Sequence, residues 1–172
     1  MQELLLLWVF DMLILVCGLP GTGKTTLAGR IAKEYSAIHL NTDIIRRKYL
    51  KERTYSEEEK KMIYEKLFSE AEKSLNEGKT VVLDGTFYKK ELRNKATDIA
   101  EKFTIIECVL DEKVLKERIG KRAMCNVASE ANYDVYLKVK EQFEPIEQEH
   151  LVLDTSLPEE EQIEKVNSWM KR

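Results

Sequence analysis

Cysteine, proline and glycine are all scarce in this sequence, with three cysteines, three prolines and seven glycines in 172 residues. The cysteines, Cys17, Cys108 and Cys125, are odd in number, lie far apart and form no CxxC pair. This argues against a disulfide framework or a structural zinc site. The sequence also lacks linkers rich in proline or glycine, low-complexity tracts and internal repeats. We therefore expect a single domain whose core is large enough to fold without covalent crosslinks.

A large charge of one sign is also missing. Lys and Arg number 28 and Asp and Glu number 31, so the formal net charge is -3. A protein that grips duplex nucleic acid over a broad face is usually basic, so this balance argues against such a role, although it is compatible with a local basic cleft. The apolar content of 43% excludes a disordered chain.

No hydrophobic run is long enough to cross a membrane. Residues 4–10 are apolar, but Asp11 interrupts them well short of the ~20 residues that a span needs, and the start of the chain is not basic as in a signal peptide. We therefore expect no membrane partner, and the cysteine pattern, typical of reduced thiols, predicts a cytoplasmic protein. Two interpretations of residues 1–11 stay open. They are either a leader outside the native start, with Met12 as initiator, or an extra strand or helix packed on the domain of residues 12–172.

Short apolar runs alternate with helical patterns along the chain. Runs of strand length lie at 12–17, 37–40, 80–83, 103–110 and 150–153. This alternation predicts an α/β fold with a central parallel sheet of about five strands. Ser56 and Glu59 have the spacing of a capping box, which predicts a helix that begins there and ends near Gly78. Because ligands of such sheets bind at the carboxyl ends of the strands, we expect functional residues directly after the strands.

The first strand leads into a phosphate-binding motif. Residues 18–25 fit G-x-x-x-x-G-K-[ST] and precede an amphipathic helix, which is the context that this motif requires. Lys24 can reach the β- and γ-phosphates of ATP, and the Thr25 hydroxyl can ligate Mg²⁺. The expected nucleotide-binding residues are Gly18, Leu19, Pro20, Gly21, Thr22, Gly23, Lys24, Thr25 and Thr26. The motif predicts a P-loop NTPase, a three-layer αβα sandwich, but not whether the phosphate is hydrolysed, transferred or used as a switch.

Further candidates follow the second and third strands. Asp43 comes just past the second strand, and Arg46 lies one helical turn later on the same face. A carboxylate there can deprotonate an acceptor hydroxyl, and an arginine beside it can hold a phosphoryl group. Asp84 ends the third strand, where an acid can either bind Mg²⁺ through water, as the second candidate metal residue beside Thr25, or hold the substrate. Arg93 is interpreted either as facing the acceptor or as a solvated side chain.

A helical lid is expected at about 118–132. Arg118 and Arg122 share a helix face, and the weakly patterned stretch that follows has the character of a hinged segment that closes over ATP. Thr155 and Ser156, after the last strand, are weaker candidates for a place near the adenine.

These motifs, taken in order over residues 12–155, resemble the P-loop kinases grouped with polynucleotide kinase and zeta-toxin-type kinases, and small predicted kinases with an AAA-type label. The resemblance rests on residues 18–25, on Asn41-Thr42-Asp43 with Arg46, on Asp84 and on residues 118–122. It implies that Asp43 is the general base on the acceptor hydroxyl and that Arg46 contacts an acceptor-side or transferring phosphate. It also implies that arginines of the lid contact the nucleotide phosphates.

The expected function is therefore transfer of the γ-phosphoryl group of Mg-ATP to a hydroxyl of a small metabolite or a nucleic-acid 5′ end, by a monomer or weak homodimer. An adenylylsulfate kinase-like enzyme is an alternative, although the acceptor segment associated with that family is missing. A P-loop ATPase or switch with no phosphorylated product is another, although the sequence has no guanine-specifying N-K-x-D motif.

Overall fold

The computed structural model describes residues 11–52, 54–124 and 133–172, except the side chains of residues 122–124. Strands and helices alternate along these ranges, as the apolar pattern predicts. In chain order the elements are β1 (Met12–Gly18), α2 (Lys24–Glu34), β2 (Ile38–Asn41), α3 (Thr42–Tyr49), α4 (Glu57–Asn76), β3 (Val81–Asp84), α5 (Lys90–Asp98), β4 (Lys102–Val109), α6 (Glu112–Met124), α7 (Tyr133–Gln142), β5 (Leu151–Asp154) and α8 (Glu159–Met170).

The five strands form one sheet in the order β2-β3-β1-β4-β5, and every neighbouring pair is parallel. β1 lies at the centre, and all seven of its residues are buried. A strand that is covered on both faces must be apolar throughout, which explains why the sequence from Met12 to Cys17 does not alternate. The prediction of a parallel α/β sheet of about five strands is confirmed.

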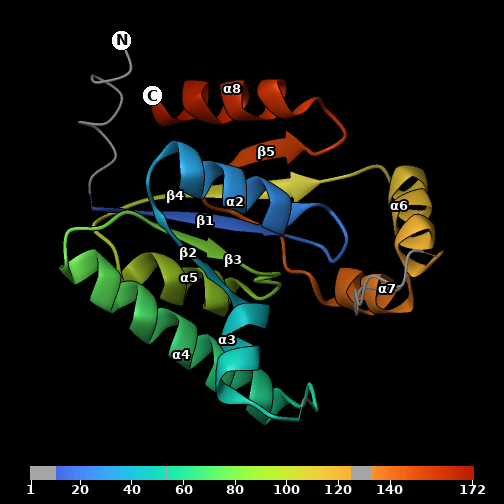
Figure 1. Ribbon diagram of the computed structural model, residues 1–172, viewed down its shortest axis with the longest axis horizontal. Helices are drawn as coiled ribbons and strands as arrows, with labels where there is room; N and C mark the ends of the chain where they lie inside the picture. Colours follow the sequence, from blue (N-terminus) through green and yellow to red (C-terminus); the bar gives the residue numbers. More distant parts are fainter. Residues whose placement is uncertain (1–10, 53, 125–132) are drawn as a thin grey trace.

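Helices cover both faces of the sheet, so the domain has three layers (Figure 1). Met12, Ile14 and Val16 of β1 point into one core, which α2 and α8 close. Leu13, Leu15 and Cys17 point into the other, which α4 and α5 close. Side chains of a strand alternate between its two faces, so β1 supplies both cores.

Helix α4 begins differently from the expected capping box. Ser56 caps it as predicted, because its Oγ accepts a hydrogen bond from the Glu59 N–H at 3.1 Å. The Ser56 N–H, however, donates to Thr54 Oγ1, and the Glu59 carboxylate bonds to Thr54, Tyr55 and Arg46 instead. The expected reciprocal half of the motif is therefore wrong.

Helices α6 and α7 lie beyond the carboxyl ends of the strands (Figure 1). They meet at Glu112, whose carboxylate accepts hydrogen bonds from Tyr133 and, at 2.9 Å, from Lys140. The expected lid includes the C-terminal half of α6, and residues 125–132 of that expectation lie outside the described residues. Within the described ranges, no helix combines the length and apolar character that a membrane crossing needs.

Candidate active site

The loop between β1 and α2 has the backbone shape that the phosphate-binding motif predicts. Gly21 and Gly23 have φ angles of 82° and 86°, in the left-handed region that other residues avoid. At Gly18 a Cβ atom would stand 2.4 Å from the carbonyl oxygen of Cys108 on β4, so only glycine fits there. The loop therefore closes tightly against the sheet and leads into the N-terminus of α2, where the helix dipole favours an anion.

Lys24 lies at the first position of α2 and folds back over this loop. Its Nζ donates to the carbonyl oxygen of Leu19 at 2.8 Å. Burial lowers the pKa of Lys24, and the charge of Asp84 opposes this shift. A polyphosphate in the loop would replace the neutral carbonyl oxygen by an anionic oxygen as the partner of this ammonium group. The hydrogen bond to the anionic oxygen is the stronger one.

Asp84 is fully buried at the end of β3, and only one of its oxygens has a partner. Oδ2 accepts from Asn41 and lies 3.2 Å from His39 Nε2, whereas Oδ1 has no hydrogen-bond partner. A buried carboxylate oxygen without a partner is costly, and a metal-bound water would satisfy it. Asn41 Nδ2 also donates to Thr25 Oγ1 at 3.4 Å. The amide of Asn41 therefore contacts both expected metal residues, Thr25 and Asp84.

These residues fit Mg²⁺, which keeps several waters and takes few protein ligands beside the substrate phosphates. The described residues contain no group of three His, Cys, Asp or Glu side chains that could hold a metal by themselves.

Asp43 and Arg46 come together as their spacing predicts. Arg46 Nη1 donates to Asp43 Oδ1 at 2.8 Å. The Asp43 side chain is 61% exposed, whereas that of Arg46 is 9% exposed and stacks on the ring of Tyr55, 4.8 Å from its centroid. The carboxylate is therefore open to a ligand, and the guanidinium behind it is held in place.

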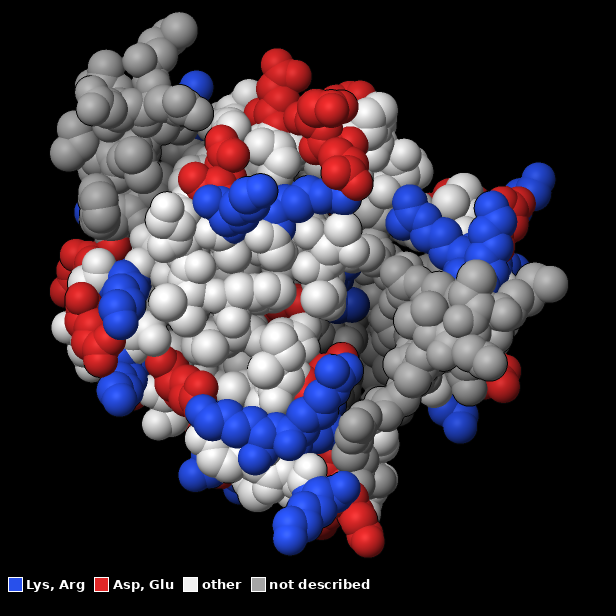
Figure 2. All heavy atoms as spheres, in the orientation of Figure 1, with Lys and Arg blue, Asp and Glu red and all other residues white. Residues whose placement is uncertain are grey.

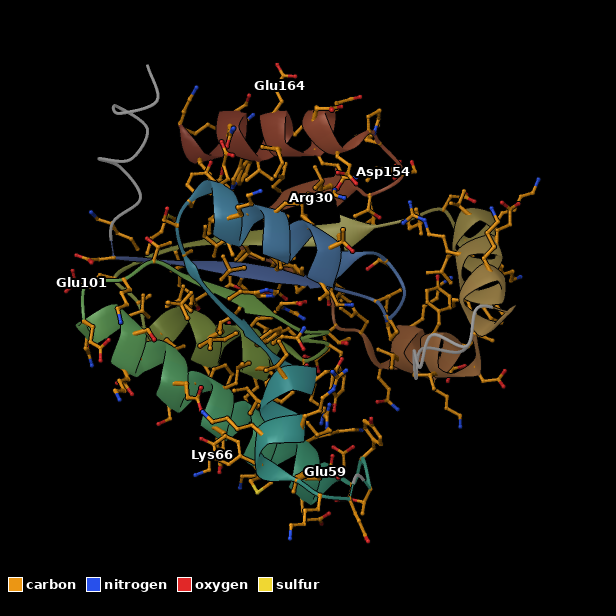
Figure 3. The ribbon with its side chains drawn as sticks, viewed as in Figure 1. Arg30, Glu59, Lys66, Glu101, Asp154 and Glu164 are labelled. Atoms are coloured by element: carbon orange, nitrogen blue, oxygen red, sulfur yellow. The ribbon has the colours of Figure 1, made fainter. Side chains whose placement is uncertain are left out.

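Glu59 is a site residue that the sequence analysis did not identify. It lies where the beginning of α4 meets α3 (Figure 3), and its Oε1 accepts from Arg46 Nε at 2.9 Å. Its Oε2 accepts from the backbone N–H groups of Thr54 and Tyr55. Desolvation alone would raise the pKa of Glu59, but the hydrogen bonds from Thr54 and Arg46 outweigh it and hold the pKa below its usual value. Glu59 is thus a charged carboxylate that fixes the guanidinium of Arg46.

Arg118 reaches the phosphate loop from α6. Its Nη2 donates to the carbonyl oxygen of Thr155 at 2.9 Å, and its Nη1 lies 3.6 Å from where a Cβ of Gly23 would stand. Thr155 Oγ1 in turn donates to the carbonyl oxygen of Thr22 at 2.6 Å. Thr155 therefore supports the loop directly. The side chain of Arg122, the second expected lid arginine, lies outside the described residues.

Arg93 fits neither of its two expected roles. It is 1% exposed, and its guanidinium donates to the carbonyl oxygens of Phe87, Glu144 and Pro145 at 2.8 to 2.9 Å. It is therefore neither solvated nor directed at an acceptor. It ties α5 to the segment that follows α7.

One cavity of about 780 Å³ joins these features. Its walls come from the phosphate loop, from the beginning of α3, from the segment after β3 and from α7. Figure 2 shows this face hollowed beside Lys and Arg side chains over α3. Its charged lining residues are Lys24, Asp43, Arg46, Arg47, Lys60, Asp84 and Lys138. Nucleotide-binding and acceptor candidates thus line the same cavity.

Two mycobacterial proteins illustrate the relatives of this chain among curated sequences. The uncharacterized protein Rv2004c of Mycobacterium tuberculosis is 31% identical over 127 residues, which cover 64% of this chain and 26% of that protein. The uncharacterized protein Mb2027c of Mycobacterium bovis matches to the same extent. The chain thus spans about a quarter of the length of these curated relatives.

Several solved structures share the fold. A sugar kinase from Janibacter sp. has a TM-score of 0.76 at 18% identity, over 93% of this chain and 94% of that chain. A gluconokinase from Sinorhizobium meliloti has a TM-score of 0.70 at 20% identity, over 95% and 93%. The Mycobacterium tuberculosis APS kinase CysC, in complex with AMPPNP and APS, has a TM-score of 0.71 at 18% identity, over 94% and 98%. At these identities the likeness shows the P-loop kinase-like fold.

A match to a family model shows which family the chain belongs to, which the shared fold alone does not show. The model described as an AAA domain, AAA_33, matches residues 13–146, from the start of β1 to beyond α7. That range holds the phosphate loop, the Asp43–Arg46 pair, Asp84 and Arg118. The chain belongs to this AAA domain family of P-loop NTPases.

Proposed function

We propose that the protein is an ATP-dependent kinase that transfers the γ-phosphoryl group of Mg-ATP to a hydroxyl group of an acceptor. The observation that carries this proposal is the exposed carboxylate of Asp43, paired with Arg46, in the same cavity as the phosphate loop. An ATPase or switch needs the loop, but it does not need a paired acid and arginine elsewhere in the same cavity.

Transfer proceeds by in-line attack of the acceptor oxygen on the γ-phosphorus. A bond forms between the acceptor oxygen and phosphorus, and the bond to the β–γ bridging oxygen breaks, so that ADP leaves with that electron pair. Asp43 accepts the proton of the acceptor hydroxyl as its oxygen attacks. Arg46 and Lys24 stabilise the charge on the transferring group and the β-phosphate. Thr25 and Asp84 would hold Mg²⁺, which neutralises phosphate charge when bound.

The acceptor is an alcohol, either on a small metabolite or at a nucleic-acid 5′ end. Three solved structures that share this fold are described as a sugar kinase, a gluconokinase and an APS kinase, which supports an alcohol acceptor. We place the chain with the polynucleotide kinase and zeta-toxin-like group, on its Asn-Thr-Asp sequence at 41–43 and the arginine at 46. The net charge of -3 favours the small metabolite.

The test is consumption of Mg-ATP with a panel of acceptors and water as the control. The panel holds 5′-hydroxyl DNA and RNA oligonucleotides, nucleosides, adenylylsulfate, sugars, sugar acids and amino-sugar nucleotides. We expect one class to accelerate ATP use and to gain phosphate, as measured by mass spectrometry of the product. Equal ATP use in every well would overturn the kinase proposal in favour of an ATPase or switch.

A further inference from the structure

The cavity is positively charged although the protein as a whole is not. Five basic and two acidic side chains line it, whereas the whole chain has a net charge of -3. Lys24 and Arg46 are the cations assigned above to the phosphates and the transferring group, and Arg46 also pairs with Asp43 and Glu59. The excess therefore rests on three other cations that the proposed handling of ATP does not use: Arg47, Lys60 and Lys138.

These three cations line the same cavity as Asp43 and the phosphate loop. Arg47 follows Arg46 in α3, and Lys60 follows Glu59 in α4, so both come from the two helices that supply the Asp43–Arg46–Glu59 group. Lys138 comes from α7, a separate wall of the same cavity. Three helices thus supply positive charge to the wall of one cavity.

Ion pairing separates these cations from their neighbours on the same helices. Lys48, next to Arg47, pairs with Glu70 at 2.6 Å, and Lys140, two residues after Lys138, pairs with Glu112 at 2.9 Å. Among the described residues, Arg47 and Lys138 have no ion-pair partner, and Lys60 pairs only with Glu57, whose side chain is 67% exposed. Cations without partners on the wall of a concave site attract and hold an anion.

We propose that the acceptor carries an oxyanion group of its own, a phosphate or a carboxylate, which Arg47, Lys60 and Lys138 bind while its hydroxyl lies at Asp43. This rests on the proposed kinase function and narrows its substrate class to small hydroxylated anions. The γ-phosphoryl group and the anionic group of the acceptor are then held by separate sets of cations.

The test uses acceptors in matched pairs that differ by one anionic group. Suitable pairs are glucose with gluconate, glucose with glucose 6-phosphate, and adenosine with its 3′-monophosphate. We expect the anionic member to be phosphorylated at least tenfold more efficiently, and the sugar-acid and phosphate arms distinguish the two sources of charge. Preference for the neutral members, or for oligonucleotides alone, would overturn the inference and leave the kinase function standing.

Variants on α7 locate the effect. Lys138→Gln is expected to raise KM for the anionic acceptor about tenfold, the effect of losing one charge-assisted hydrogen bond, and to leave KM for ATP unchanged. Lys140→Gln is the matched control, because this lysine lies on the same helix and pairs with Glu112. Equal effects of the two variants would contradict the assignment of the anion to Lys138.

A binding measurement keeps the inference testable if no acceptor is turned over. With Mg-AMPPNP filling the phosphate loop, inorganic phosphate is titrated into the protein by calorimetry. We expect one further phosphate to bind, and Lys138→Gln but not Lys140→Gln to weaken it at least fivefold. Loss of all phosphate binding in the presence of AMPPNP would refute the second anion site, whereas a failed acceptor panel with this binding intact would refute only the kinase.

Discussion

The two ends of the cavity are built in opposite ways. The proposed nucleotide end is essentially one continuous stretch, residues 18–26, in which the backbone of the loop between β1 and α2 would form the site. The proposed acceptor end draws on residues of α3, α4 and α7 and on Tyr55, in the segment before α4, all of which line the cavity. A site formed by one segment can be recognised as a sequence motif. A site formed by side chains from several helices can change its ligand through single substitutions that leave the fold intact.

This comparison implies that the two ends can be disabled separately. Damage at the nucleotide end should abolish every use of ATP. Damage at the acceptor end should abolish transfer and leave ATP binding, together with slow hydrolysis to water. The predictions below test that separation.

The largest effect is expected for Asp43→Asn. The amide cannot take the acceptor proton, so phosphoryl transfer should fall by about 10²–10⁴, the usual contribution of general acid–base catalysis. KM for ATP should stay within about twofold, because Asp43 lies on the acceptor wall. Product formation and ATP use are measured side by side. The control is Asp98→Asn, an exposed carboxylate at the end of α5. Unchanged phosphoryl transfer in Asp43→Asn would refute the assignment of Asp43 as the general base.

Lys24→Ala should lower turnover by about 10²–10³, the cost of losing one electrostatic donor at the transferring group. Unlike Asp43→Asn, it should lower hydrolysis to water and transfer together, because it acts on ATP itself. Rates with and without acceptor are compared, and circular dichroism checks the fold. If transfer fell while hydrolysis persisted, the two ends would not be separable in the proposed way.

Glu59→Gln tests whether a buried carboxylate sets up the acceptor end. The amide keeps the shape of Glu59 but not the charge that holds Arg46, so kcat should fall about 10- to 100-fold with an unchanged KM for ATP. Ser56→Ala is the matched control. It removes the cap of α4, at a cost of about 1 kcal/mol in stability, but keeps the Glu59–Arg46 pair. A similar fall in kcat for Ser56→Ala would mean that the start of α4, rather than the charge of Glu59, is what matters.

What could be predicted from the sequence follows the same division. β1 is a continuous apolar run and each other strand has an apolar segment. The phosphate loop is one motif, and Asp43 and Arg46 are an i,i+3 pair, so all of these depend on local spacing. The role of Arg93 depends on distant partners, and that of Glu59 depends on Arg46, 13 residues earlier and on another helix. Arg93 donates to a carbonyl 51 residues away, and Glu59 has local spacing that favours a different hydrogen bond from the one it makes. Contacts between different elements are set by packing of the whole domain, and no periodic pattern in the sequence predicts them.

Arg118 either supports the phosphate loop through Thr155 or acts on the transferring phosphoryl group. We expect the first role, so its substitution should have the smallest effect of the four. Its guanidinium donates to the carbonyl oxygen of Thr155, and Thr155 in turn supports the loop at Thr22. Arg118→Ala should therefore raise KM for ATP about tenfold, as for one lost charged hydrogen bond, and change kcat little. Lys121→Ala, an exposed cation on the same helix, is the control. Measurement of kcat and KM over a range of ATP concentrations separates the outcomes. A fall in kcat as deep as that of Lys24→Ala would show that Arg118 acts on the transferring phosphoryl group, and that α6 closes over both ends of the cavity rather than supporting one.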